Sequence, residues 1–152
     1  MIKRLTLSDT DIVEQLWILQ HSAYRLEAQA IGLTEMPPLP DTFDSIRTSR
    51  DVFIGELSED GELLGAIAVR DEMPGSMEIT RLMVHPNHLR QGIGAKLLQY
   101  VLTNHLDKQE FTVTASPQNA PAVALYRKFG FRPVRSVQSA SGVELMIYRL
   151  NQ

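Results

Sequence analysis

Two glycines stand where a predicted helix follows a predicted strand, in the segment Arg90-Gln91-Gly92-Ile93-Gly94-Ala95. Because glycine has no side chain, backbone there can approach a ligand closely and leaves its amide N–H groups unobstructed. The first amides of a helix have no partner within the helix, and the helix dipole favours an anion beside them. The segment therefore predicts a pyrophosphate site, with tight packing alone as the alternative use of its glycines. It is not a P-loop, because no Gly-Lys-Ser/Thr follows.

A second candidate is Tyr126, in a predicted helix from Asn119 to Phe129. Asn119 is a favourable N-cap, and Gly130 suits the left-handed position that follows a helix. The tyrosine belongs to an apolar stripe at helical spacing, made of Ala122, Leu125, Tyr126 and Phe129. An aromatic residue in such a stripe usually serves the core. A chemical role for Tyr126 is therefore a hypothesis that depends on its pairing with the glycine turn.

Hydrophobic periodicity predicts the elements that must position these residues. A strand over 2–7 is followed by a helix that begins at a Ser8–Asp11 capping box and ends near Gly32, and then by a short helix over 41–49. Further strands are expected over 52–57, 63–69, 77–85, 111–115, 131–137 and 143–150, and further helices over 91–106 and 119–129. This order predicts an α/β fold, in which one mixed, twisted sheet carries helices on both faces. Residues 1–152 read as a single domain.

Composition limits the classes of function. The formal net charge is −3, so there is no overall basic field to hold nucleic acid or an anionic membrane. The absence of cysteine excludes disulfides, thiolate metal sites and cysteine nucleophiles, and we expect no metal. Neither a signal peptide nor an apolar run of roughly 20 residues is present. We expect a cytoplasmic protein, and the sequence leaves a homodimer open.

Together the two motifs resemble those of the GNAT superfamily of N-acetyltransferases. Its first motif, Arg/Gln-x-x-Gly-x-Gly/Ala, follows a strand that ends here as Leu82-Met83-Val84-His85-Pro86. Its second motif is matched by Asn119, Ala122, Leu125, Tyr126, Lys128, Gly130 and Phe131. The order of elements also agrees from about residue 2 to 150. One departure is that Leu89 stands where the family has its leading Arg or Gln, with Arg90 one place later.

The resemblance implies acetyl-CoA as co-substrate and a role for each matching position. The amides of Gln91 to Ala95 would hold the pyrophosphate, with Arg90 as a side-chain contact. The strand residues Leu82, Met83 and Val84 would pair with the pantetheine arm like an added strand. Asn119 would contact the pantetheine or frame the thioester, and Tyr126 would protonate the leaving thiolate.

Acyl transfer to an amine also needs a base, because an amine of pKa about 10 is mostly protonated at pH 7. Glu78 and His85, on and just after the strand 77–85, are the candidates, with a solvated surface role as the alternative for each. By alternation, Glu78 shares a face with Thr80, Leu82 and Val84. Without a cysteine or a Gly-x-Ser-x-Gly motif, we expect direct transfer in a ternary complex. A non-catalytic acyl-CoA sensor of the same fold is the competing interpretation.

The acceptor would be a primary amine of a small molecule or a peptide. In this superfamily the first two helices and their connection usually cover the acceptor pocket, which here corresponds to about 24–46. The candidate substrate contacts are Tyr24, Glu27 and Asp41, and the region also holds Glu35 and Asp44. A locally acidic wall would attract a cationic amine, with surface and capping charges as the alternative. The stretch Pro37–Pro40 would stiffen its rim.

Overall fold

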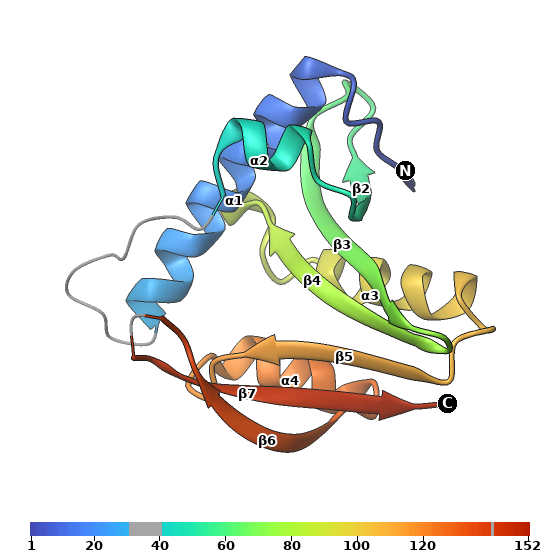
Figure 1. The fold of residues 1–152 in the computed structure, drawn as a ribbon. Helices are drawn as coiled ribbons and strands as arrows, with labels where there is room; N and C mark the ends of the chain where they lie inside the picture. Colours follow the sequence, from blue (N-terminus) through green and yellow to red (C-terminus); the bar gives the residue numbers. More distant parts are fainter. Residues whose placement is uncertain (31–40, 141) are drawn as a thin grey trace.

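Seven strands form one mixed sheet in the computed structural model, which describes residues 1–30, 41–140 and 142–152 (Figure 1). Their spatial order is β1-β2-β3-β4-β5-β7-β6, and all neighbours are antiparallel except β4 and β5. The strands are β1 (Ile2–Arg4), β2 (Val52–Leu57), β3 (Leu63–Met73), β4 (Ser76–Val84), β5 (Glu110–Ala115), β6 (Arg132–Gln138) and β7 (Glu144–Asn151). The predicted α/β class with a mixed sheet is confirmed.

Helices cover both faces of this sheet, each over its own hydrophobic cluster. On one face, α1 (Thr10–Ala30) and α2 (Phe43–Arg47) pack on a cluster that includes Leu16, Ile46 and Phe53. On the other, α3 (Ile93–Asn104) and α4 (Ala120–Lys128) enclose a larger cluster that includes Leu97 and Phe111. A short 3-10 helix, η1 (Pro86–His88), joins β4 to α3. The buried residues of α3 are Ile93, Leu97, Leu98, Val101 and Leu102.

Some predicted boundaries differ from the structure. Asp9, rather than Ser8, caps α1, because its carboxylate accepts from the Asp11 N–H at 3.0 Å and its carbonyl accepts from the Val13 N–H at 3.1 Å. The helix predicted over 91–106 ends at Asn104, so Leu106 lies beyond α3 and is 75% exposed. The predicted helix end at Gly32 and the stretch Pro37–Pro40 lie outside the described residues.

A β-bulge at Thr80 corrects one prediction about β4. Ala68 of β3 pairs with Arg81, but the next residue, Val69, pairs with Ile79, so Thr80 is the extra residue. The two faces of β4 therefore exchange at this point. Met77 and Ile79 pack in the cluster under α3, whereas Met83 packs in the cluster under α1. The expectation that Glu78 shares a face with Leu82 and Val84 was wrong, because uniform alternation fails at a bulge.

The same place on β4 is where it separates from β5. The parallel pairing joins Ser76–Ile79 to Glu110–Val113 and goes no further. Beyond Ile79, β4 therefore has no pairing to β5, although β5 continues its pairing with β7 through Ala115. The strands diverge in Figure 1, with β4 running toward α1 and β5 toward the start of α4. The sheet thus leaves a backbone edge of β4 open to a ligand.

Candidate active site

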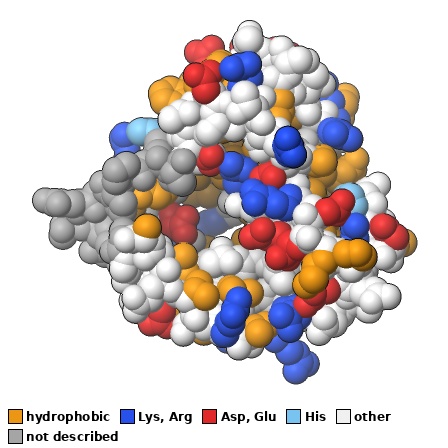
Figure 2. Space-filling model, viewed as in Figure 1, with side chains coloured by type: hydrophobic (Ala, Val, Ile, Leu, Met, Phe, Trp, Pro, Cys, Tyr) orange, Lys and Arg blue, Asp and Glu red, His pale blue; other side chains and the backbone are white. Residues whose placement is uncertain are grey.

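A pocket of about 440 Å³ occupies the opening between β4 and β5. Its lining comes from α1 on one side, from β4 and β5 in the middle and from α4 on the other. Figure 2 shows a hollow on this face of the molecule, with acidic and basic side chains gathered around it. Residues 20 and 126, far apart in the chain, thus share one cavity because the divergence of two parallel strands leaves room there.

The glycine turn lies between β4 and α3, as predicted. Gly92 is the N-cap of α3 with φ +77°, a left-handed conformation that glycine adopts at no steric cost, and a Cβ there would meet nothing within 4 Å. The first bond of the helix runs from the Lys96 N–H to the Gly92 carbonyl at 3.0 Å. The amides of Ile93, Gly94 and Ala95 therefore stand at the helix start without a partner in the helix. Open backbone and free amides fit a bound phosphate.

The second glycine of the turn, Gly94, lies beside both α4 and β4. A Cβ on Gly94 would lie 3.4 Å from Leu125 Cδ2 of α4 and 3.7 Å from Val84 Cγ2 of β4. The start of α3 thus lies close to both the second motif and the open strand. The open space at Gly92 is compatible with close approach of a ligand, whereas the distances at Gly94 are ordinary van der Waals contacts and do not by themselves require glycine. Arg90 also has a positive φ, 63°, and both Arg90 and Gln91 are exposed.

Tyr126 is at once a core residue and part of the pocket wall. It is 5% exposed, and its ring lies 5.7 Å from Phe131 and 6.1 Å from Tyr148 between centroids. It also lines the pocket from α4. Burial, together with the nearby charge of Glu27, raises the pKa of its hydroxyl. The phenol therefore stays protonated at neutral pH and can act as a proton donor.

Asn119 holds the beginning of α4 at the pocket. Its side-chain oxygen accepts from the Ala122 N–H at 3.4 Å, and its carbonyl accepts from the Val123 N–H at 3.0 Å, so the predicted N-cap is confirmed. After the helix, Gly130 has the expected positive φ of 96°. The cap fixes where Asn119 and Tyr126 stand on the α4 side of the pocket.

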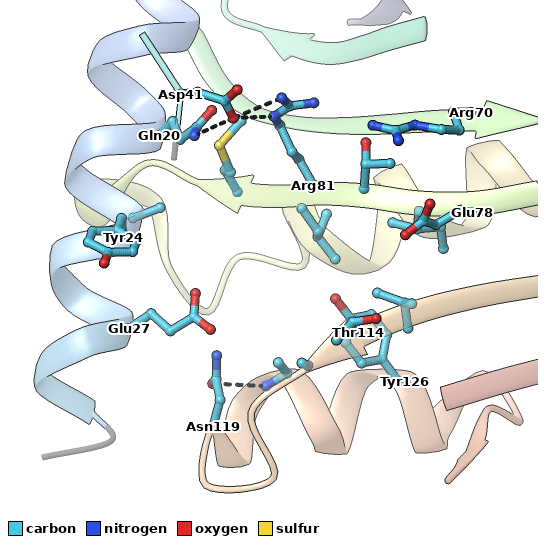
Figure 3. A pocket seen from close by; sticks show the side chains of 18 residues that line it. Gln20, Tyr24, Glu27, Asp41, Arg70, Glu78, Arg81, Thr114, Asn119 and Tyr126 are labelled. Atoms are coloured by element: carbon cyan, nitrogen blue, oxygen red, sulfur yellow. Dashed lines mark hydrogen bonds and ion pairs between the residues drawn. The ribbon is translucent and has the colours of Figure 1, made fainter. Parts of the chain in front are cut away.

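Helix α1 presents a polar face to the opposite side of the pocket. Gln20, Ala23, Tyr24 and Glu27 line it at i, i+3, i+4 and i+7. Glu27 is exposed at the mouth and points across toward Asn119 (Figure 3). Although the residue as a whole is exposed, the pocket walls around its carboxyl reduce the hydration of that group and raise its pKa, and a hydrogen-bonding interaction with the Asn119 side chain offsets part of that rise. Burial and the charge of Glu27 likewise raise the pKa of Tyr24.

Asp41 also lines the pocket, but its carboxylate is already engaged. It accepts from Gln20 Nε2 at 2.8 Å and from Arg81 Nη2 at 2.8 Å (Figure 3). It also accepts from the Ser45 hydroxyl at 3.0 Å. Burial alone would raise its pKa, but these donors outweigh burial and lower it. Asp44, also counted in the acidic wall, pairs with Arg47 at 3.4 Å, and Glu35 lies outside the described residues. Of the wall's carboxylates that the structure describes, Glu27 alone forms no ion pair with a described basic residue.

Sequence reasoning missed the ion network beside Asp41. Arg81 also donates to Asp51 at 2.9 Å, and Arg70 donates to the same carboxylate at 3.0 Å. The Thr80 hydroxyl adds a bond of 2.9 Å, and the Asp51 side chain is only 5% exposed. Although burial opposes it, these bonds lower the pKa of Asp51. A charged residue among the apolar residues of β4 was the one local signal, because such a residue needs a buried partner.

The two candidate bases lie in different places. Glu78 lines the pocket, opposite Arg70 in the β3–β4 register. Burial, and then the charge of Glu72, raise the pKa of Glu78, while Arg70 opposes the rise. His85 lies past the end of β4 and outside the pocket lining, where its Nδ1 accepts from the Asn87 N–H at 3.1 Å. The structure therefore brings together Tyr126, Asn119, Tyr24, Glu27, Asp41 and Glu78, but not His85.

None of the helices in the described ranges is both long enough and apolar enough to cross a membrane. Within the same ranges, no group of three or more His, Asp or Glu is placed to hold a metal ion.

Comparison with known proteins identifies the family to which this chain belongs. Residues 44–152 match the family model described as an acetyltransferase (GNAT) domain. The chain is 33% identical over 150 residues to the Bacillus subtilis (strain 168) protein named UPF0157 protein YqkA, covering 99% of this chain and 43% of that protein. It is 31% identical over 96 residues to the peptidyl-lysine N-acetyltransferase YiaC of Escherichia coli (strain K12), covering 60% of this chain and 61% of YiaC. The chain thus matches only part of the length of both curated relatives.

Solved structures show the same fold. The ribosomal-protein-S18-alanine N-acetyltransferase from Escherichia coli superposes with a TM-score of 0.77 at 17% identity, over 99% of this chain and 92% of that one. An aminoglycoside 6′-N-acetyltransferase complexed with coenzyme A gives a TM-score of 0.78 at 12% identity, over 99% and 96%. At these identities the likeness concerns the fold. With the family match over residues 44–152, the chain belongs to the GNAT acetyltransferase family, a family of acyltransferase enzymes.

Proposed function

We propose that this domain transfers the acetyl group of acetyl-CoA to a primary amine of a small molecule or peptide, directly and in a ternary complex. The observation that carries the proposal is the meeting of three features at one opening. These are the unpaired edge of β4 beyond Ile79, the left-handed Gly92 at the start of α3, and Tyr126 in the pocket wall. Each supplies one part of what a thioester donor needs.

The residues present fit a CoA thioester. The amides that begin α3, Ile93 to Ala95, supply donors for the pyrophosphate, with Gln91 and Arg90 exposed beside them. The β4 backbone from Leu82 to Val84, unpaired toward β5, offers hydrogen bonds to the amides of an extended pantetheine arm. The edge leads into the pocket that Asn119 and Tyr126 line.

The donor supplies an acyl group on a thiol of pKa about 8.5. Tyr126, kept protonated by burial, can donate its proton to the departing sulfur, and its raised pKa makes that transfer depend on the charge that develops there. The acceptor amine must lose a proton, for which the pocket offers the carboxylates of Glu27 and Glu78. His85, outside the lining, would need a water chain to serve.

The proposed reaction needs neither a metal ion nor a particular cellular location or oligomeric state. The mechanism uses no metal ion, since acid, base and anion-binding groups all come from the chain. A cytoplasmic location, a homodimer, and the lack of nucleic-acid or membrane partners stay predictions of the sequence. They do not affect the chemistry proposed for the pocket.

The acceptor is proposed to be cationic. With Asp41 held by Arg81, the charge available on the α1 side is that of Glu27, which can attract an ammonium group to the mouth of the pocket. The relatives named for peptidyl-lysine and for aminoglycosides agree with such an acceptor, since their names denote amine-bearing substrates. Neither name decides between a peptide and a small molecule.

A sensor that binds acyl-CoA without turnover is the second candidate, and acceptor-dependent turnover separates the two. Release of CoA from acetyl-CoA would be followed with spermidine, kanamycin, a lysine-centred hexapeptide, a peptide with a free alanine N-terminus, glycine and glutamate, with hydrolysis in buffer subtracted. We expect the cationic amines to react faster than glycine and glutamate. Tight acetyl-CoA binding without release for any amine would favour the sensor, and reaction of glutamate alone would reverse the acceptor assignment.

A further inference from the structure

Glu27 is placed differently from the other carboxylates at the pocket. It is the last member of the pocket-lining face of α1, it is exposed at the mouth, and no ion pair to a described basic residue holds it. Asp41 and Asp51, in contrast, each accept from arginine. A carboxylate tied to a guanidinium is a poor proton acceptor, because the neighbouring cation favours its ionised form. Glu27 lacks that constraint.

The direction in which Glu27 faces is the second observation. From α1 it points across the pocket to the α4 side, where its carboxylate interacts with the Asn119 side chain (Figure 3). Its charge also acts on the hydroxyl of Tyr126. An amine that enters from the mouth and approaches a thioester beside Tyr126 therefore passes Glu27. Acid and base would lie on opposite walls of one cavity, so that one can face the departing sulfur and the other the entering amine.

Glu78 is the rival, and its position is less favourable. It stands in the stretch where β4 and β5 are still paired, opposite Thr112, whereas the strands separate only after Ile79. It also lies across from Arg70 in the β3–β4 register, and the charge of Arg70 favours the ionised form of Glu78. The Glu78 backbone therefore lies before the point where the strands separate, although its side chain lines the pocket.

Resting on the proposed acetyl transfer, we propose that Glu27 is the catalytic base that takes the proton from the acceptor amine. The amine nitrogen forms a bond to the acetyl carbon, the carbon–sulfur bond breaks, and the electron pair of that bond goes to sulfur. Before that attack, the ammonium form of the acceptor gives one proton to Glu27, which releases it to solvent. As the new bond forms, a second proton passes from the nitrogen to Glu27, and one passes from the Tyr126 hydroxyl to sulfur. The proton on Glu27 then restores Tyr126 through solvent, so ammonium plus thioester become amide, thiol and one proton in solvent.

The groups around Glu27 make a pH profile interpretable. The titratable groups that face it are Tyr24 on its own helix and Tyr126 on α4, and both have pKa values raised above 10.0. Asp41 precedes α2 and Asp51 precedes β2. Both pair with Arg81 of β4 and have lowered pKa values, so the two aspartates stay ionised. Glu78 has a raised pKa like Glu27, so it must be tested in parallel.

The experiment measures kcat/KM against pH for wild type, Glu27→Gln and Glu78→Gln, with the panel amine that the wild type acetylates fastest. Glu14→Gln is the matched control, because Glu14 is an exposed glutamate of the same helix outside the pocket. We expect Glu27→Gln to lower kcat/KM by about 100-fold at pH 7, as loss of a general base does. The loss in kcat/KM should become smaller as pH rises toward the pKa of the amine itself, because the ammonium proton is then lost to solvent without a base from the protein. A role in binding alone would raise KM and leave the shape of the profile unchanged.

The outcomes separate this proposal from the proposed function. If the wild type releases no CoA with any amine, the acetyltransferase proposal fails and the role of Glu27 fails with it. If the wild type is active, but Glu78→Gln loses the rate and the acid limb of the profile while Glu27→Gln keeps both, then Glu27 is not the base. Acetyl transfer itself would still stand in that case.

Discussion

The substitution Gly92→Asp tests the proposed phosphate site at the start of α3, and we expect the variant to fold. The residue has φ +77°, and a Cβ there meets no atom within 4 Å, so the cost to folding is the left-handed conformation, about 1–2 kcal/mol at most. Aspartate is among the residues that accept this conformation best. The variant should therefore fold. Its carboxylate would stand beside the amides of Ile93 and Gly94, where the pyrophosphate is proposed to bind.

The loss of affinity follows from charge and volume. A unit charge about 6 Å from a phosphate charge costs about 0.7–2.8 kcal/mol for effective dielectric constants of 80 to 20. Displacement of the phosphate by the side chain adds to this. We therefore expect acetyl-CoA to bind at least about tenfold more weakly, or about 1.4 kcal/mol, by isothermal titration calorimetry.

Gly61→Asp is the matched control. Gly61 has φ +81°, and a Cβ there also meets nothing within 4 Å, but it lies in the turn between β2 and β3. The two variants carry similar backbone strain, so their thermal stabilities should fall by similar amounts. Only Gly92→Asp should lose acetyl-CoA affinity. Unchanged affinity in a folded Gly92→Asp protein, or an equal loss in both variants, would refute the phosphate assignment.

Three other changes test the pocket. Tyr126→Phe keeps the packed ring and removes the acid, so kcat should fall about 10²–10⁴-fold with acetyl-CoA affinity little changed; a near-normal kcat with a lower Tm would mean a core role only. Arg81→Met leaves two mostly buried carboxylates without their shared cation and should lower the free energy of unfolding by about 3–5 kcal/mol in urea titrations; a loss below about 1 kcal/mol would contradict the importance of the network. The pKa of Glu27 is raised above 4.5 in the folded protein, so the folded state binds the carboxyl proton more tightly than the unfolded state does. The resulting contribution to the free energy of unfolding is fully present below pH 4.5 and is lost as pH rises through the raised pKa. Glu27→Gln should therefore raise Tm more at pH 7 than at pH 4, and equal shifts at both pH values would count against the raised pKa.

Most of the fold could be predicted because its elements are encoded locally. The strand of 52–57 was predicted with the bounds that the structure has, and the helix that carries Tyr126 was predicted within one residue at each end. Its cap and its final glycine are short-range signals. The glycine turn and Tyr126 were found for the same reason, since their motifs depend on spacing within a few residues.

What could not be predicted depends on contacts between distant segments. The bulge at Thr80 changes which face of the sheet the later residues of β4 point to, and no residue type in that strand indicates a bulge. Arg81 reaches Asp51 and Asp41 across 30 and 40 positions of sequence, so their pairing follows from the way α1, α2 and β4 pack. Asp41 was therefore interpreted as a free acceptor contact, whereas the structure shows it engaged by Arg81.

The central claim is direct transfer of acetyl from acetyl-CoA to an amine, and mass spectrometry of a single turnover tests it most directly. Protein in excess over acetyl-CoA with an isotopically labelled acetyl group would be mixed with the most reactive panel amine and quenched at intervals. The account predicts labelled amide at the rate of CoA release, no labelled protein at any time, and a slow reaction with Tyr126→Phe. Label on the protein before it reaches the amine, or label recovered only as acetate, would contradict it.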